Sequence, residues 1–199
     1  MKIKPGFFKA ALLAIAFSGI SPNAFCGGKV TGTIEASMDK YKTGAVVYLK
    51  GVPGKIKPKT ATIEQKNLAF RPHVVAIPVG STVSFVNHDN VNHDIFADDK
   101  SKKLDINTST PGLIKKAEFD KAGVVNLLCT IHAEMSGYVV VVNSNYSAVT
   151  GDDGKFTIKN VPPGRYEVAV WSEKLKSAAK KIVTVKDGRT SNVVISLEK

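Results

Sequence analysis

The residues most able to do chemistry in this sequence are three side chains at regular spacing: Cys129, His132 and Met135. Apolar runs flank them at 124–128 and 138–142, and each run is typical of a β-strand. A thiolate, an imidazole and a thioether would therefore share one loop between two strands. This donor set suits copper, particularly if a second histidine completes a His2Cys plane with the methionine as a weak axial ligand.

The second histidine must come from elsewhere, and His93 is the best placed because it begins a separate apolar stretch. Two other histidines, His73 and His88, could bind a second metal weakly. A surface or turn position is the more common role for such residues. His88 is the substitute ligand if His93 is not one.

An isolated histidine followed by C-x-x-H-x-x-M resembles the pattern of the cupredoxins, blue copper proteins such as plastocyanin, pseudoazurin and amicyanin. The short Cys–His–Met spacing is most similar to that of amicyanin, and the resemblance covers residues 61–143. It implies a Greek-key β-sandwich that binds one type 1 copper ion. The ligands it implies are three equatorial residues and one long axial methionine: His93, Cys129, His132 and Met135.

The residue after the first implied ligand carries a further expectation. In related cupredoxins a residue at this place, usually Asn, commonly ties its strand to the cysteine loop by hydrogen bonds. Here the residue is Asp94, so the tie would depend on the charge of a carboxylate.

The composition changes after residue 142. The segments 152–156 (D-x-G-x-F) and 162–166 (P-P-G-x-Y) are similar to carboxypeptidase-regulatory or prealbumin-like Ig modules. In two stretches an apolar residue recurs at every second position, which predicts strands with one apolar face. The alternating residues are Tyr166, Val168 and Val170, then Val193, Ile195 and Leu197.

Residues 146–199 offer about five strands, fewer than the roughly seven of an Ig-like sandwich. Two predicted strands at 29–36 and 45–50 could supply the missing pair. We therefore predict an all-β protein, with a cupredoxin domain at 61–143 inserted into a smaller Ig-like sandwich made of 29–52 plus 146–199. The alternative is a tandem arrangement, 29–143 followed by 146–199.

The N-terminus has the features of an export signal. Lys2, Lys4 and Lys9 precede an apolar stretch at 10–17 that is too short for a finished membrane helix. Cleavage after Cys26 would make 1–26 a signal peptide and leave no integral membrane segment in the mature protein. Lipid attachment at Cys26 is the alternative. We expect a periplasmic or otherwise exported (secreted) protein.

Charge and cysteine count add to this picture. The net charge of the 199 residues is +11, and losing the three lysines of the signal peptide would leave +8. A basic protein favours an acidic partner. The chain has 2 cysteines, so Cys129 would be the only one left after export. A bound metal would protect this lone thiol from oxidation.

The function predicted from these residues is the transfer of single electrons, without enzyme activity, and the expected partner is a redox protein rather than a nucleic acid. Copper delivery and a non-redox binding module are the alternatives. The 4 histidines are too few for a trinuclear copper cluster beside this site, and no hydrolytic constellation stands out. The arrangement also looks like plastocyanin-like proteins associated with methylamine utilisation, which implies an electron relay.

Overall fold

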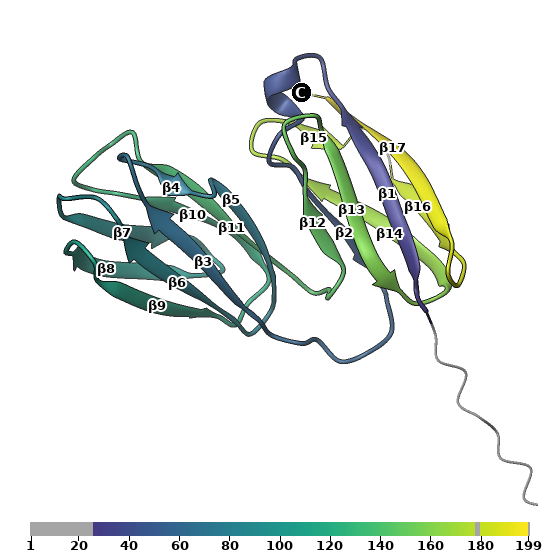
Figure 1. Ribbon diagram of the computed structural model, residues 1–199, viewed down its shortest axis with the longest axis horizontal. Helices are drawn as coiled ribbons and strands as arrows, with labels where there is room; N and C mark the ends of the chain where they lie inside the picture. The colour runs from purple at the N-terminus through teal and green to yellow at the C-terminus, as the bar shows by residue number, and fades with distance from the viewer. Residues whose placement is uncertain (1–25, 178–179, 199) are drawn as a thin grey trace, which may run out of the picture.

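The computed structural model describes residues 26–177 and 180–198, so the predicted signal peptide lies outside the described residues except for Cys26. The strands form four sheets arranged in two lobes (Figure 1). The predicted all-β class is confirmed, and the one helical element in the described part is a short 3-10 turn, η1 (Asp39–Tyr41). No helix among these residues is long and apolar enough to cross a membrane.

The middle of the chain forms one lobe, which we call the central sandwich. Its sheets have the strand orders β5-β11-β10-β7-β8 and β4-β3-β6-β9. Large apolar side chains such as Phe85, Ile95 and Leu127 fill the core between these sheets. The strands are β3 (Thr60–Gln65), β4 (Phe70–Arg71), β5 (Val74–Pro78), β6 (Ser81–Asn87), β7 (His93–Asp98), β8 (Lys103–Ser109), β9 (Ile114–Phe119), β10 (Gly123–Leu128) and β11 (Ser136–Val142).

Two separate segments of the chain form the other lobe, which we call the split sandwich. Its sheets have the strand orders β13-β1-β17-β15 and β12-β2-β14-β16. The strands are β1 (Gly28–Glu35), β2 (Val46–Lys50), β12 (Ser147–Val149), β13 (Lys155–Val161), β14 (Gly164–Trp171), β15 (Lys176–Ser177), β16 (Lys181–Val185) and β17 (Thr190–Glu198).

The two N-terminal strands complete the split sandwich. Strand β1 runs parallel to β17 and antiparallel to β13, and β2 lies antiparallel to both β12 and β14. The predicted alternation in β14 and β17 is confirmed, because Tyr166 and Val168 on β14 and Ile195 and Leu197 on β17 all lie in one buried core.

Gly32 of β1 is a position where only glycine fits. It lies between β13 and β17, and a Cβ there would overlap both the carbonyl oxygen of Val193 and the ring of Phe156. We expect Gly32→Ala to lower the free energy of unfolding by about 1–3 kcal/mol, because overpacking forces neighbours apart. Denaturant titration measures this loss. Gly151→Ala is the control, since the nearest atom to its Cβ would be 3.6 Å away, and an equal loss in both variants would contradict the prediction.

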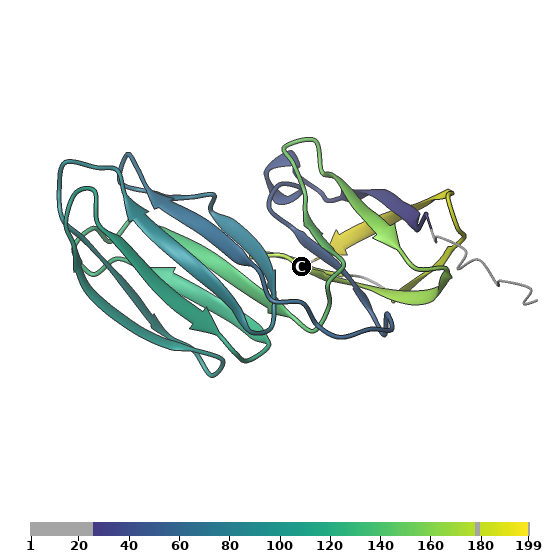
Figure 2. The same ribbon diagram turned by 60° about the horizontal axis from the view of Figure 1, so that its bottom comes forward.

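An apolar layer joins the two sandwiches, which lie side by side in both views (Figure 1 and Figure 2). On β11, Val139 and Val141 point into the central core while Val140 and Val142 point into this layer. Strands buried on both faces have continuous apolar sequences, which explains the valine run. The remaining members of the layer are Val46, Tyr48, Val74, Ala76, Val124, Tyr138 and Trp171.

Candidate metal centre

The loop between β10 and β11 presents three of the four predicted ligands. Cys129 follows β10 directly and Met135 precedes β11, and the N–H of Cys129 donates to the carbonyl oxygen of Met135 at 3.2 Å. The N–H of Met135 donates in turn to the carbonyl of His132 at 3.0 Å. The Cys129 and Met135 side chains are buried in the central core, whereas His132 is half-buried. The pairing of β10 with β11 thus holds the loop closed at its base.

The fold brings the fourth predicted residue, His93, to the same place. His93 is the first residue of β7, which is the neighbour of β10 in the five-stranded sheet, and its side chain is fully buried. Its Nδ1 lies 3.1 Å from His132 Nδ1, and Cys129 Sγ lies 3.9 Å from the same His132 nitrogen. One ligand atom from each of the three residues lies within 4.8 Å of the other two.

These separations suit a small ion with nitrogen and sulfur ligands. Ligands bound at about 2.0–2.3 Å around one ion lie about 3.3–4 Å from one another, close to the distances seen here. A set of two imidazoles and a thiolate, with a thioether in the same loop, fits copper better than a hard cation. The side chains present at this end of the sandwich therefore fit the metal that the sequence predicted.

Asp89 contacts the ring nitrogen of His93 that is not directed at His132. The sequence analysis did not single out Asp89. The Nε2–H of His93 donates to Asp89 Oδ2 at 2.8 Å, which fixes the hydrogen on Nε2 and leaves the Nδ1 lone pair facing the cluster. The same carboxylate accepts the backbone N–H groups of Asn67 at 2.6 Å and Leu68 at 3.0 Å. Burial alone would raise the pKa of Asp89, but the hydrogen bonds from Leu68, His93 and Asn67 hold it below its ordinary value.

Asp94 makes the tie expected at its position. The N–H of Thr130 donates to Asp94 Oδ1 at 2.6 Å, and the Thr130 hydroxyl donates to Oδ2. Burial would raise the pKa of Asp94, but the hydrogen bonds from Thr130, with a further one from Cys129, hold the pKa below its usual range. The carboxylate is therefore charged at neutral pH and joins β7 to the ligand loop.

The pKa direction for Asp94 gives a prediction about acid stability. A carboxyl whose pKa is lowered by folding stabilises the protein above its ordinary pKa, and this contribution is lost as the pH falls through the lowered value. We expect Asp94→Asn to reduce the free energy of unfolding of the metal-free protein by about 1–2 kcal/mol near pH 7, with the difference shrinking near pH 3. Denaturant titrations at the two pH values test this. Asp120→Asn, at an exposed turn, is the control, and a deficit in Asp94→Asn that stays constant with pH would contradict the prediction.

The other two histidines lie outside the cluster. His88 is exposed, and its Nε2 lies 3.8 Å from Glu64 Oε1, so the structure gives it no part beside His93. His73 is also absent from the cluster, but its ring contacts the ligand loop through the carbonyl of Ser136 at 3.0 Å. His73 therefore lies beside the ligand loop without belonging to the cluster.

Comparison with protein families agrees with this geometry. Residues 58–142 match the family of copper binding proteins of the plastocyanin/azurin type, and residues 130–198 match the carboxypeptidase regulatory-like domain. Both predicted resemblances are confirmed. The two matches overlap at 130–142, which comprises most of the ligand loop and β11. A comparison with curated proteins found no match.

Several solved structures are similar to part of the chain. A copper-containing nitrite reductase (NirK) from Thermus scotoductus SA-01 is 28% identical over 45% of this chain and 24% of its own, with a TM-score of 0.41. The chain thus spans about a quarter of that enzyme. A purple cupredoxin from Nitrosopumilus maritimus is 26% identical over 41% of this chain and 99% of its own, with a TM-score of 0.37. A reduced amicyanin variant is 17% identical over 48% of this chain and 98% of its own, with a TM-score of 0.40.

The family match and the sandwich around the His–Cys–His cluster define the class of the central part of the chain by its fold: it is a cupredoxin-like β-sandwich. More particularly, this sandwich is similar to the copper binding proteins of the plastocyanin/azurin family, and the Ig-like part of the chain is similar to the carboxypeptidase regulatory-like domain.

Proposed function

We propose that this protein is an exported type 1 copper protein that carries single electrons between redox partners and has no enzymatic activity. The observation that supports it most is the cluster of His93, Cys129 and His132 at the end of the central sandwich. These three side chains would hold the ion, with the thioether of Met135 as the long axial ligand. Copper bound by such a set changes little in geometry between Cu(I) and Cu(II), which suits electron transfer.

The burial of the ligands favours electron transfer over copper delivery. His93 and Met135 are fully buried and Cys129 is 4% exposed, so a bound ion would be difficult to remove. Only the half-buried His132 offers a ring edge toward solvent, and the neighbouring Ile131 gives it an apolar rim because its side chain is 52% exposed. The shortest route for an electron would therefore pass through His132.

The remaining parts of the proposal concern the chain as a whole. We infer that the cupredoxin domain is inserted into the Ig-like one, because β1 and β2 pair with strands of the split sandwich rather than with the central one. The lysine-rich N-terminus supports export. The charge of +8 expected after export would steer an acidic redox protein, with Lys100, Lys102, Lys103, Lys115 and Lys116 as candidate contacts.

Copper titration of the metal-free full chain tests the proposal. We expect one equivalent of Cu(II) to produce an intense visible absorption band and voltammetry to show a reversible one-electron wave. A colourless, redox-silent complex would contradict the proposal. Rapid transfer of the bound copper to a chelating acceptor protein would instead favour delivery, because an electron carrier must retain its ion through many cycles.

A further inference from the structure

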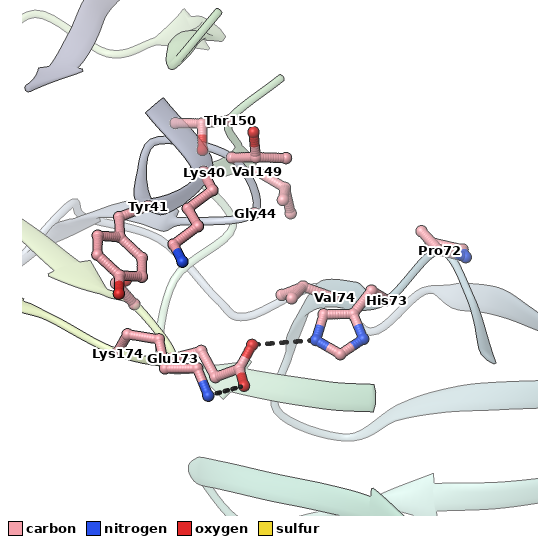
Figure 3. Close-up of a pocket in the computed structure, with 12 residues that line it drawn as sticks. Lys40, Tyr41, Gly44, Pro72, His73, Val74, Val149, Thr150, Glu173 and Lys174 are labelled. Carbon is pink, nitrogen blue, oxygen red and sulfur yellow. Dashed lines mark hydrogen bonds and ion pairs between the residues drawn. The ribbon is translucent and has the colours of Figure 1, made fainter. Parts of the chain in front are cut away.

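The ring of His73 bridges the ligand loop and the split sandwich. His73 lies in the turn between β4 and β5, and its Nδ1 is 3.0 Å from the carbonyl oxygen of Ser136, the residue after Met135. Its Nε2 is 3.1 Å from Oε2 of Glu173, which follows β14 in the other sandwich (Figure 3). One side chain thus connects the base of the candidate copper loop to the Ig-like domain.

The two partners of His73 are both hydrogen-bond acceptors. A carbonyl oxygen and a carboxylate oxygen can only accept hydrogen bonds, whereas a neutral imidazole has a single N–H to donate. Both contacts are hydrogen bonds only when both ring nitrogens carry hydrogen, as they do in an imidazolium. Burial would raise the pKa of Glu173, but the hydrogen bonds from His73 and Lys174 hold it below its ordinary value, so the carboxylate is charged.

Other charged and titratable groups surround the pair. Nζ of Lys174 lies 3.1 Å from the second oxygen of Glu173, and Tyr138 meets the His73 ring edge-on at 5.5 Å between centroids. A cleft of about 310 Å³ between the sandwiches opens beside them, with Lys40 and Tyr41 on its far wall (Figure 3). Arg71 and Glu134 line a second hollow that His73 also borders.

We infer that His73 is a positioning residue: in its doubly protonated form it clamps the copper-ligand loop, at Ser136, to Glu173 of the Ig-like domain. The inference rests on the proposed function where it concerns copper. Histidine changes charge between about pH 5 and pH 8, and a neutral ring can keep only one of the two hydrogen bonds. The clamp is therefore complete when the ring carries both hydrogens and half-released when the ring is neutral.

The single tryptophan of the chain reports on the clamp without copper. Trp171 lies in the apolar layer, and its ring contacts that of Tyr138 in a tilted arrangement with 5.1 Å between centroids; Tyr138 in turn contacts His73. We expect the Trp171 emission of the metal-free full chain to show one step between about pH 5 and pH 8.5. The step should disappear in His73→Gln and persist in His88→Gln, the matched control at another exposed histidine paired with a glutamate. A flat wild-type profile, or the same step in His73→Gln, would overturn the inference.

Glu173→Gln separates a charged clamp from simple packing. The amide keeps the shape and one acceptor oxygen of Glu173 but removes the charge that favours imidazolium, so the emission step should move to lower pH. A step at the wild-type pH in this variant would count against the clamp. His73 and Glu173 are 48% and 29% exposed in their side chains, and circular dichroism will confirm that both variants fold.

Copper affinity tests the other end of the clamp. Loss of one hydrogen bond to the loop should make the affinity of His73→Gln about fivefold weaker than wild type near pH 5.5, with the ratio approaching one near pH 8.5. The ratio cancels any titration of the ligands themselves, because both proteins share it. A ratio that does not change with pH would overturn the inference. Failure of both proteins to bind copper would instead overturn the proposed function, and the Trp171 measurement would still decide whether the clamp exists.

Discussion

Replacing Cys129 by serine is expected to abolish the intense visible absorption of the copper-loaded protein. The thiolate is the soft ligand that selects copper in a His2Cys site, and a hydroxyl cannot replace it. Loss of a hydrogen-bond partner outside the ligand set weakens metal affinity by about 10–100-fold. Loss of the Cys129 thiolate, a direct ligand, should weaken copper affinity by more than this. Absorption titration with Cu(II), together with competition against a chelator of known affinity, measures both effects.

The chain provides a matched control for this variant. In the uncleaved full chain, Cys26→Ser changes the other cysteine, which is exposed and precedes β1, and should leave the band unchanged. Cys129 is 4% exposed, so its serine variant should lose about 1–3 kcal/mol of stability from burying a hydroxyl and remain folded in denaturant titrations. An unchanged band in Cys129→Ser would rule out the proposed copper site.

The short-range part of the candidate site could be predicted from the sequence. Cys129, His132 and Met135 share one loop, so residue type and spacing were sufficient to place them together. His93 was chosen because it begins an apolar stretch, and the resemblance to a family supported the choice, but nothing in the local sequence specifies that β7 becomes the neighbour of β10. That contact is made by the order of strands in the five-stranded sheet.

Other features depended on contacts that leave little trace in the sequence. The polar stretch at 97–111 has the composition of a loop with at most a short edge strand at 104–106, yet strand β8 extends over 7 of its residues. Strand β8 is at an edge and pairs only with β7 in its sheet, so few of its side chains need to be apolar. Leu104 and Ile106, which pack on the central core, were the only sign of it.

The contact between the sandwiches had a visible sequence signal that was not used. Runs such as 74–77 and 139–142 are apolar at every position. In a strand with one solvent-exposed face, apolar and polar residues alternate instead. The runs indicate that both faces of β5 and β11 are covered. They do not indicate what covers them, because the second cover comes from Val46 and Trp171, which are distant in the chain.

Replacing Asp89 is expected to have the largest effect of any change outside the ligand set. Its carboxylate holds the Nε2–H of His93 and, through Asn67 and Leu68, a turn in which two consecutive non-glycine residues have positive φ angles of 55° and 54°. Such a turn needs support from its surroundings. Asp89 therefore orients the buried histidine and stabilises the backbone beside it.

Asp89→Asn should weaken copper binding by about 10–100-fold and raise the reduction potential. A negative oxygen on Nε2–H makes the imidazole a stronger electron donor, which favours Cu(II), and a neutral amide removes this preference. Chelator competition and voltammetry measure the two effects, with Asp105→Asn on the exposed side of β8 as the control.

The two roles of Asp89 can be separated, because only one of them concerns the metal. If Asp89 only supports the turn, Asp89→Asn will reduce the stability of the metal-free protein and leave the potential of the loaded protein where it was. If it also tunes His93, the potential will rise even under conditions where both proteins are fully folded. A reduction potential equal to that of the wild type would therefore show that Asp89 has only a structural role. A shifted potential without loss of stability would show that Asp89 acts only on the copper site.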